Sequence, residues 1–508
     1  MGLAIVHSRA SLGVLAPQVT VEVHIGPGMP GFHLVGLAET SVKESKDRVR
    51  SAIMNSRFSF PRHKITVNLA PADLPKDGGR FDLPIAIGIL VASEQIPVDK
   101  INDVELVGEL ALSGELRPVR GVISAAIASK REKRILISPA QNASQVRLVD
   151  EHSNLSASSL LQVSGFLASQ LELDLELAPA VDTPPTPTKN MQDVIGQQQG
   201  KRALEIAAAG QHNLIFIGPP GTGKTMLAAR LPDLIPPMSK QEALEVAAVS
   251  SLVDQDLDEN SWRKRPFRAP HHSSSMAALV GGGSSPKPGE ISLAHNGVLF
   301  LDELPEFERR VLDALREPLE AGEIAISRAS GKTCFPARFQ LIAALNPSPS
   351  GQYKEGQLGA SPQVILKYLS RISGPFLDRF DMSVETPLLP LGTLSEGGDR
   401  GDSTEVCLAR VSQAREIMLA RAGKPNARLS NREMDQYCVL LKEDAEFLEF
   451  AITRLGLSIR AYHRIIRVAR TIADLALSET ITREHLSEAL GYRAMDRLLL
   501  SIHRQVAG

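Results

Sequence analysis

A glycine-rich segment near the middle of the chain has the residue types and spacing of a phosphate-binding loop. Residues 218–225 read GPPGTGKT and match GxxxxGK[ST] at every fixed position. Glycines let the backbone curl so that successive N–H groups face phosphate oxygens, and a following helix N-terminus adds partial positive charge. We predict a strand over 213–218 and a helix continuing over 226–231. The motif predicts an ATP site in which Lys224 reaches the β- and γ-phosphates and Thr225 binds Mg²⁺.

Two carboxylates directly follow a second apolar stretch farther along the chain. Residues 298–301 (VLFL) read as a buried strand and lead into Asp302 and Glu303. In a phosphate-loop hydrolase, an acid at such a position holds the metal, and a second polar group orients the attacking water. We therefore expect Asp302 to hold Mg²⁺ and Glu303 to orient and deprotonate water. This pairing favours hydrolysis over simple nucleotide binding.

Two further polar residues suit a hydrolytic site. Asn346 follows the apolar stretch 339–345, and its amide can position water or sense the γ-phosphate; an Asn-Pro turn is the alternative. Arg379 lies in the stretch 377–381 (LDRFD). Because this arginine cannot readily serve its own loop, we expect it to act as an arginine finger on a neighbouring subunit. The alternative is a surface Asp–Arg pair. An arginine finger would imply that the subunits assemble into a ring.

In order and spacing, these motifs resemble those of AAA+ ATPases. The stretches 267–273 (FRAPHHS), 288–297 (PGEISLAHNG), 1–10 and 457–475 resemble more particularly the magnesium-chelatase-like ATPases of the YifB/ComM type. The resemblance implies an α/β fold: an AAA+ P-loop core with a parallel sheet and a helical lid, preceded by a Lon-protease-like (ribosomal S5 domain 2-like) α+β domain. It also implies a hexameric ATP-driven DNA helicase that drives branch migration of recombination intermediates in natural transformation.

The resemblance assigns further contacts to the nucleotide. Residues 193–197 (DVIGQ) are similar to the segment that packs over the adenine, and Arg460 occupies the sensor-2 position, from which a lid arginine contacts the nucleotide. The predicted nucleotide-binding set is Gly218, Pro219, Pro220, Gly221, Thr222, Gly223, Lys224, Thr225, Met226, Val194, Ile195 and Arg460. Glu303, Asn346 and Arg379 are the predicted catalytic residues, and Thr225 and Asp302 the predicted metal ligands.

The charge balance constrains how the chain can meet DNA. The formal net charge is −2, from 56 Lys+Arg and 58 Asp+Glu, which excludes a protein that coats DNA through overall charge. Residues 324–333 alternate around a glycine and predict a β-hairpin, and relatives project such a hairpin into the ring channel. We expect Arg328 and Lys332 to contact backbone phosphates there.

Three arginines of the lid lie on one helix face: Arg460, Arg464 and Arg467. They either contact phosphates or form salt bridges with a neighbouring subunit. His271 and His272 lack a nearby acidic or thiolate partner in the sequence, so we expect no metal there.

Composition shifts divide the chain. Repeated prolines make 178–190 a linker, and the Gly-, Ser- and Asp-rich stretch 391–404 reads as a flexible loop. The predicted domains are a Lon-like domain (1–177), an AAA+ core with a helix-2 insert and a hairpin before the sensor strand (191–390), and a helical lid (405–508).

The Lon-like segment lacks the residues for proteolysis. The resemblance aligns Arg80 with the nucleophilic serine and Ile123 with the general-base lysine of proteolytic relatives. Without a nucleophile and an amine base, amide hydrolysis cannot proceed by that route. Arg80, Arg117 and Arg120 then form either a cationic surface for DNA or a partner, or the solvated arginines of an oligomerisation domain.

Three cysteines without a CxxC pair indicate a reducing compartment, and the first residues make a poor signal peptide. The most apolar run, 83–92, is too short to span a membrane. We therefore expect a cytoplasmic protein without membrane contact. Its expected partners are single-stranded or branched DNA, further copies of itself in a homohexameric ring, and recombination proteins. Two alternatives remain: the motor subunit of a magnesium-chelatase-type metal-insertion complex, and an ATP-regulated protein-remodelling scaffold.

Overall fold

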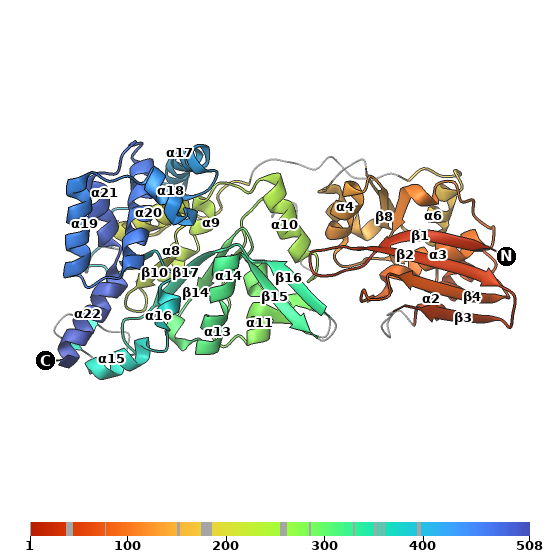
Figure 1. The fold of residues 1–508 in the computed structure, drawn as a ribbon, viewed down its shortest axis with the longest axis horizontal. Helices are drawn as coiled ribbons and strands as arrows, with labels where there is room; N and C mark the ends of the chain where they lie inside the picture. Colours follow the sequence, from red (N-terminus) through yellow and green to blue (C-terminus); the bar gives the residue numbers. More distant parts are fainter. Residues whose placement is uncertain are drawn as a thin grey trace.

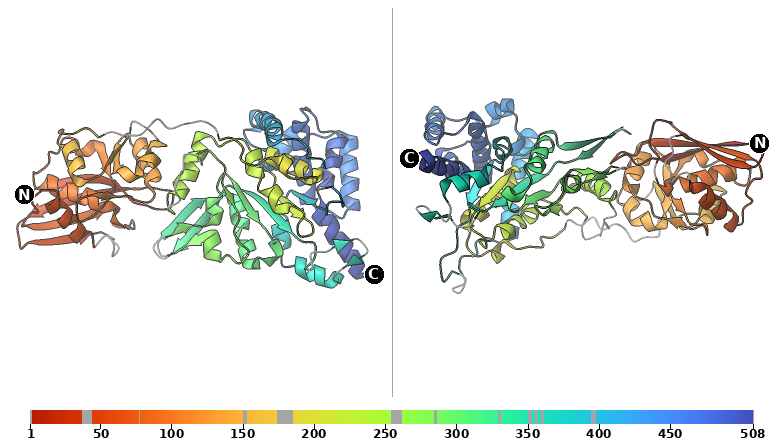
Figure 2. Two further views of the ribbon diagram at one scale, coloured as in Figure 1. Left: turned by 180° about the vertical axis from the view of Figure 1, so that it is seen from behind. Right: turned by 90° about the horizontal axis from the view of Figure 1, so that it is seen from below.

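The computed structural model describes residues 2–36, 44–76, 78–149, 153–173, 185–253, 262–283, 286–328, 331–349, 353–354, 357–358, 361–393 and 398–507. The molecule is elongated, and its two termini lie toward opposite ends (Figure 1). We call residues 2–173 the N-terminal module, 185–393 the core module and 398–507 the helical module. The views in Figure 2 show the core and helical modules side by side, with the N-terminal module extending away from them.

The N-terminal module is built on one seven-stranded mixed sheet with the order β3-β4-β2-β1-β5-β8-β9. The strands are β1 (Leu3–Arg9), β2 (Gln18–Gly26), β3 (Gly31–Val35), β4 (Lys64–Ala70), β5 (Val104–Leu106), β8 (Ile135–Pro139) and β9 (Asn154–Ala157). Strand β2 is antiparallel to both β1 and β4, and the other neighbouring strands are parallel.

Helices cover this sheet. They are α2 (Ser45–Asn55), α3 (Asp82–Ala92), α4 (Val122–Arg131), α5 (Ala143–Arg147) and α6 (Leu160–Leu167), and a small hairpin joins β6 (Glu109–Leu110) to β7 (Leu116–Arg117). All eleven residues of α3 are buried, and the helix packs on β1 and β2. The most apolar run of the sequence is thus a core helix, surrounded by protein on every side.

Of the three arginines predicted to form a cationic surface or to be solvated, Arg117 and Arg120 are exposed and Arg80 is buried. Arg80 is only 5% exposed and donates a hydrogen bond to the carbonyl of Arg120 at 2.8 Å. The expectation of a solvated or ligand-facing side chain is therefore wrong for Arg80. Arg117 does keep an exposed side chain and lies 3.7 Å from the carboxylate of Glu109.

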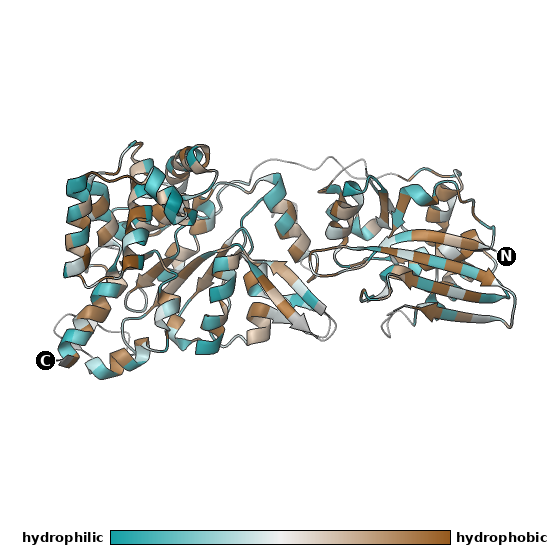
Figure 3. Cartoon of the chain, in the orientation of Figure 1, coloured by the Kyte–Doolittle hydropathy of each residue, from teal (hydrophilic) through white to brown (hydrophobic). Residues whose placement is uncertain are grey.

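The core module contains a five-stranded parallel sheet with the order β11-β14-β17-β10-β20. Its strands are β10 (Leu214–Ile217), β11 (Phe267–Arg268), β14 (Val298–Leu301), β17 (Gln340–Leu345) and β20 (Met382–Glu385). Every residue of β10, β14 and β17 is buried, since helices cover both faces. This explains their apolar sequences, in which Gln340 at the start of β17 is the polar exception. Figure 3 shows these hydrophobic strands beside the more hydrophilic α13 and α14. The strands predicted before the phosphate loop, before Asp302 and before Asn346 are confirmed.

The helices of the core module are α7 (Gln198–Gly210), α8 (Lys224–Ala228), α9 (Leu231–Leu234), α10 (Lys240–Ser250), α11 (Met276–Val280), α12 (Glu290–Leu293), α13 (Arg309–Ala314), α14 (Arg316–Ala321), α15 (Pro362–Leu369) and α16 (Gly374–Leu377). The helix predicted over 226–231 begins at Lys224 and ends at Ala228. It starts immediately after Gly223, and a separate helix with Pro232 in its first turn follows.

Three two-stranded ribbons complete the core module. The hairpin predicted over 324–333 is present as β15 (Glu323–Arg328) and β16 (Gly331–Pro336), which pair Ile324 with Phe335 and Ile326 with Thr333. Lys332 is exposed, whereas the hairpin tip and the side chain of Arg328 lie outside the described residues. The other ribbons are β12 (Gly281–Gly282) with β13 (Lys287–Pro288), and β18 (Tyr353–Lys354) with β19 (Gln357–Leu358).

The helical module consists, where described, of α17 (Thr404–Ala422), α18 (Asn431–Tyr437), α19 (Lys442–Arg454), α20 (Ile459–Leu475), α21 (Arg483–Gly491) and α22 (Ala494–Ala507). The segment expected to be a flexible loop is bonded to the core module where it is described. The N–H of Gly196 donates to Asp399 O at 3.0 Å, and Lys201 Nζ donates to Arg400 O at 2.7 Å. Residues 394–397, and most of the predicted linker 178–190, lie outside the described residues. Within the described part of the chain, no helix is both long and apolar enough to cross a membrane.

Candidate nucleotide site and an arginine-lined cavity

The phosphate-binding loop joins β10 to α8 at the carboxyl edge of the central sheet. Gly221 and Gly223 have φ values of 78° and 88°, in the left-handed region that favours glycine. A Cβ built on either residue would meet no atom within 4 Å, so the space beside this part of the loop is open. At Gly218, in contrast, a Cβ would overlap the carbonyl oxygen of Thr386. The glycines therefore provide both the curl of the loop and its close packing on the sheet.

Lys224, the first residue of α8, is buried beside the loop. Its ammonium donates to the carbonyl oxygens of Gly218 at 2.7 Å and Pro219 at 2.8 Å, and to Asn346 Oδ1 at 3.2 Å. Burial lowers the pKa of Lys224, and the carboxylates of Asp302 and Glu303 act in the opposite direction. Asn346 thus contacts the lysine that is expected to reach the terminal phosphates.

The two expected metal ligands are brought together. Thr225 Oγ1 donates to Asp302 Oδ2 at 2.7 Å, although the residues come from different elements. Hydroxyl and carboxylate oxygens suit Mg²⁺, which keeps several waters and takes few protein ligands. In the part of the chain that the structure describes, no group of three or more His, Cys, Asp or Glu residues is placed to hold a metal ion. The site therefore suits a metal bound together with phosphates better than a cage made of protein alone.

Glu303 has an unusual backbone and an unforeseen partner. Its φ is 52°, and its N–H donates to Asp302 Oδ1 at 2.9 Å. Its carboxylate lies 3.1 Å from Nδ1 of His272, which follows β11. Sequence reasoning gave His272 no acidic partner, because none is near in sequence. The adjacency of β11 and β14 explains the contact, since residues that follow neighbouring parallel strands meet at one edge.

The segment expected to cover the adenine lies beside the phosphate loop. Gln197 Nε2 donates to the carbonyl oxygens of Thr222 at 3.1 Å and Pro387 at 2.7 Å. Val194 is only 4% exposed and belongs to the apolar core, so of the two residues assigned to the adenine Ile195 alone keeps a partly exposed side chain. Met226 on α8 is 47% exposed and available for contact.

Arg379 lies at the opposite end of the strands of the same sheet, beyond their amino ends. Its carbonyl accepts a hydrogen bond from Asn213 Nδ2 at 2.8 Å, and Asn213 directly precedes β10. The four residues of β10 separate this point from the phosphate loop by about 13 Å of strand. Arg379 pairs with Glu320 on α14, and its Nε is buried without a hydrogen-bond partner in the described part of the chain. Burial and the neighbouring Arg316, Arg460 and Arg464 lower the pKa of Arg379.

Arg460 lies at this same end of the strands, away from the phosphate loop of its own chain. It contacts Asp378 Oδ2 at 3.2 Å, and Arg464 contacts Asp378 Oδ1 at 2.8 Å. Arg464 is buried and also donates to the carbonyl of Phe380 at 2.9 Å. In this structure Arg460 contacts Asp378 and not the phosphate loop of its own chain, so its contact with a nucleotide stays a prediction. The contact with Asp378 arises because α20 packs its N-terminal turn on the loop before β20.

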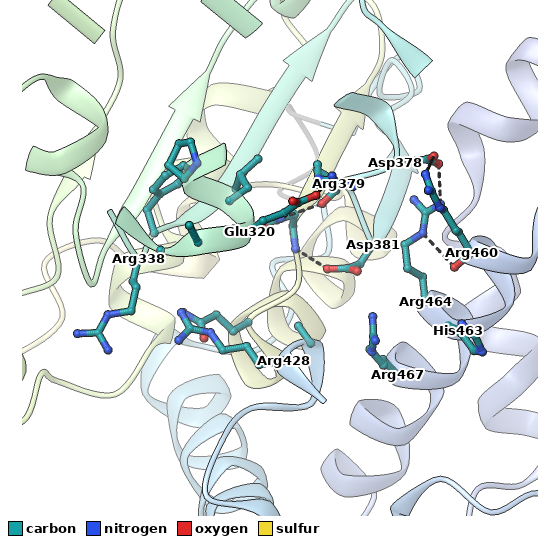
Figure 4. Close-up of a pocket in the computed structure, with 18 of the residues that line it drawn as sticks. Glu320, Arg338, Asp378, Arg379, Asp381, Arg428, Arg460, His463, Arg464 and Arg467 are labelled. Carbon is teal, nitrogen blue, oxygen red and sulfur yellow. Dashed lines mark hydrogen bonds and ion pairs between the residues drawn. The ribbon is translucent and has the colours of Figure 1, made fainter. Parts of the chain in front are cut away.

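These arginines line one cavity of about 650 Å³ (Figure 4). Its cationic lining consists of Arg338, Arg379, Arg428, Arg460, Arg464 and Arg467, and its acidic lining of Glu320, Asp378 and Asp381. The surplus of positive charge suits an anionic ligand or surface. Sequence reasoning missed Arg338 and Arg428, which stand at the amino end of β17 and before α18, and no sequence motif marks either residue.

Comparisons with known proteins agree with this geometry. Family models match residues 190–394 (magnesium chelatase, subunit ChlI), 21–142 (subunit ChlI of Mg-chelatase) and 401–493 (magnesium chelatase, subunit ChlI C-terminal). The competence protein ComM of Haemophilus influenzae is 60% identical over 98% of this chain and 99% of its own length. The uncharacterised protein YifB of Salmonella typhimurium is 56% identical over the full length of both chains. The magnesium-chelatase 38 kDa subunit of Cereibacter sphaeroides is 26% identical over 61% of this chain and 97% of its own.

The family is one of AAA+ ATPases, and the largely parallel core sheet with its phosphate-binding loop fits that fold. Since the similarity to ComM and YifB extends over essentially the whole chain, including the N-terminal module, the chain belongs to the ComM/YifB-type magnesium-chelatase-like proteins.

Proposed function

We propose that this chain is an ATP-driven DNA motor, active as a homohexameric ring, that remodels recombination intermediates during natural transformation. The observation that carries the proposal is the division of one catalytic set between opposite edges of one sheet. Lys224, Thr225 and Asp302 stand at the carboxyl edge, and Arg379 stands beyond the amino ends of the strands. A single chain cannot bring both to one phosphate without unfolding β10. Two copies packed edge to edge can.

Within such a junction, each residue has a defined task. Lys224 and the loop N–H groups bind phosphates, and Thr225 and Asp302 would hold Mg²⁺, which supplies charge neutralisation when bound. Glu303 accepts the proton of the attacking water, and Asn346 orients that water or senses the γ-phosphate. The neighbour contributes Arg379 and, from the same cavity, Arg460. Asp378 contacts Arg460 and Arg464 and thereby fixes the direction from which these cations approach.

Contact with DNA is proposed at the β15–β16 hairpin. Its alternating sequence leaves Lys332 exposed near the tip, and Arg328 lies directly opposite Gly331 in the ladder. Phosphate contacts of this kind bind without reading sequence. The name of the competence-protein relative supports a competence-associated role. We further propose recombination proteins as partners.

For the N-terminal module we propose a Lon-like fold without proteolytic activity. Ile123, at the position of the lysine base, is fully buried, and Arg80 replaces the serine. We also propose a cytoplasmic location, consistent with the free thiols of all three cysteines.

The matching family models favour a second candidate, the motor subunit of a metal-insertion complex. It explains the nucleotide site equally well. The magnesium-chelatase relative, however, covers only 61% of this chain, whereas ComM and YifB cover all or nearly all of it.

Strand displacement by the purified full chain separates these candidates. Forked and four-stranded DNA are presented with ATP, without ATP, and to the Glu303→Gln variant. We expect displacement only by the wild-type chain with ATP, and retained ATP binding without turnover in Glu303→Gln. ATP turnover that DNA does not change, with no DNA binding in any nucleotide state, would favour a chelatase motor or a protein-remodelling scaffold. Unchanged turnover in Glu303→Gln would refute the catalytic assignment.

A further inference from the structure

The turn between β1 and β2 reaches out of the N-terminal module and lies on the hairpin of the core module. We call residues 10–17 the β1–β2 tip; Figure 1 shows it extending toward β15 and β16. Gly13 is buried at its centre with φ 59°. A Cβ at this position would lie 2.8 Å from Thr333 Cγ2 and 3.1 Å from Cys334 O, both on β16. Glycine therefore permits a contact that any larger residue would push apart.

The neighbouring residues of the tip face in different directions. Val14 is half-buried and packs against the apolar cluster that contains Ile324, Ile326 and Phe335 of the hairpin. Leu15, the next residue, is 60% exposed. Val14 therefore faces the hairpin, whereas Leu15 faces solvent.

The tip is held rigidly from within its own module. Arg9 is 3% exposed and donates to both carboxylate oxygens of Glu105 at 2.6 and 2.7 Å, and to Ala16 O at 3.2 Å. Leu12 and Leu15 exchange backbone hydrogen bonds of 3.0 and 3.1 Å. A buried ion pair and a closed turn therefore transmit the position of the sheet to the tip.

A second contact fixes the N-terminal module to the core. The N–H of Gly121, before α4, donates to Ser251 O, after α10, at 3.0 Å. One apolar cluster contains Ile123 of α4 together with Ala247 and Ala248 of α10. With two separate attachments, the module cannot pivot freely about either one.

We propose that the N-terminal module is a brace for the β15–β16 hairpin, in which Gly13 and Val14 position the hairpin relative to the core sheet. This proposal assigns a structural role to the opening stretch 1–10, whose Arg9 anchors the tip. The stretch takes no part in the candidate nucleotide site. Only the identity of the hairpin's ligand rests on the proposed function. The positioning itself does not depend on DNA.

Hydrogen exchange of the full-length chain tests the positioning directly. In Val14→Ser, amides of residues 323–336 should exchange about fivefold faster, because the hairpin loses an apolar partner while α20 keeps its own. Leu15→Ser is the matched control, since it makes the same kind of change on the solvent side of the tip. Equal exchange in both variants and the wild type would overturn the brace.

A second pair of variants examines the contact itself. Gly13→Ala should increase exchange in β16, and Gly13→Ala with Thr333→Ser should return part of the way, since the clashing methyl is removed. No recovery in the double variant would show that the strain lies inside the tip and overturn the contact. DNA-stimulated ATP turnover, measured on Val14→Ser and Leu15→Ser, then separates the two proposals. Faster hairpin exchange with unchanged stimulation would keep the brace and refute DNA as the hairpin's ligand.

Discussion

The placement of Arg379 and Lys224 at opposite edges of the sheet predicts that two different defective chains can complement each other. Lys224→Ala removes the phosphate-binding lysine and keeps Arg379. Arg379→Ala keeps the phosphate loop and removes the arginine. Arginine fingers contribute about 10³-fold or more to turnover, so each variant alone should be nearly inactive. A junction that joins the loop of the Arg379→Ala chain to the arginine of the Lys224→Ala chain is complete.

The expected recovery follows from counting junctions. In rings assembled at random from equal amounts of the two chains, about one junction in four carries both intact halves. If junctions act independently, the mixture should reach about a quarter of wild-type turnover. The chains are mixed, assembled with ATP and assayed for phosphate release at constant total protein.

A mixture of Lys224→Ala and Glu303→Gln provides the control. Both lesions lie on the loop side of the junction, so no arrangement of these chains yields a complete site. We expect no recovery above the sum of the two variants. If the mixture of Lys224→Ala and Arg379→Ala also shows no recovery of ATP turnover, the division of the site between subunits is refuted. Full activity of Arg379→Ala alone would refute it as well.

Three further predictions concern other parts of the chain. Arg464→Met removes the two charge-assisted hydrogen bonds that join α20 to Asp378 and to Phe380 O, which contribute about 3 kcal/mol together. We expect kcat to fall at least tenfold with little change in the KM for ATP. A proportional rise in KM would show that Arg464 acts on substrate binding instead. Burial raises the pKa of Asp82 from 3.8 to about 6 against the opposing effect of Arg48, so the native carboxyl binds a proton between pH 4 and pH 6 while the unfolded one does not. The free energy of unfolding should therefore fall by at most about 3 kcal/mol as pH rises through that window, and Asp82→Asn should remove this slope in urea unfolding followed by exchange of α3 amides. Burial raises the pKa of both Cys407 and Cys438 to about 11, so a thiol reagent at pH 8 should label Cys334 well before either, as peptide mapping can check; early labelling of Cys407 or Cys438 would contradict their burial.

The nucleotide site was largely predictable from sequence because its chemistry is contiguous along the chain. β10 and β14 are short and apolar throughout, and β17 is apolar after Gln340. Asp302 and Asn346 directly follow their strands, and the glycine loop after β10 leads to Lys224. Parallel strands place their carboxyl ends at one edge, so Lys224, Asp302 and Asn346 had to meet once the strands were identified. The order of the strands was not needed for that conclusion.

The sequence could not predict which side chains from different helices and strands contact one another. His272 meets Glu303 only because β11 lies beside β14. The sequence predicts Arg80 on a cationic or solvated surface, yet it donates to the backbone carbonyl of Arg120 from a buried position. Arg460 is expected at a nucleotide, but a motif gives only a position in the chain. It carries no information about which end of the sheet that position faces or which subunit's nucleotide it would meet.

The helical module is bonded to both edges of the core sheet, which bears on how a ring could couple its sites. At the phosphate-loop edge, Gly196 donates to Asp399, and Gln197 donates to the carbonyl of Thr222 within the loop. At the arginine edge, Arg464 is buried between Asp378 and Phe380 O. In the proposed ring, a displacement of the loop on phosphate binding would act on the start of the helical module, and α20 begins beside the residues that would face the neighbouring subunit. Arg464 would lose two charge-assisted bonds if α20 moved alone, so a motion that carries the Asp378–Arg379 turn with the helix costs less. In the proposed ring, such a motion would let the occupancy of one site alter the cations presented to the next.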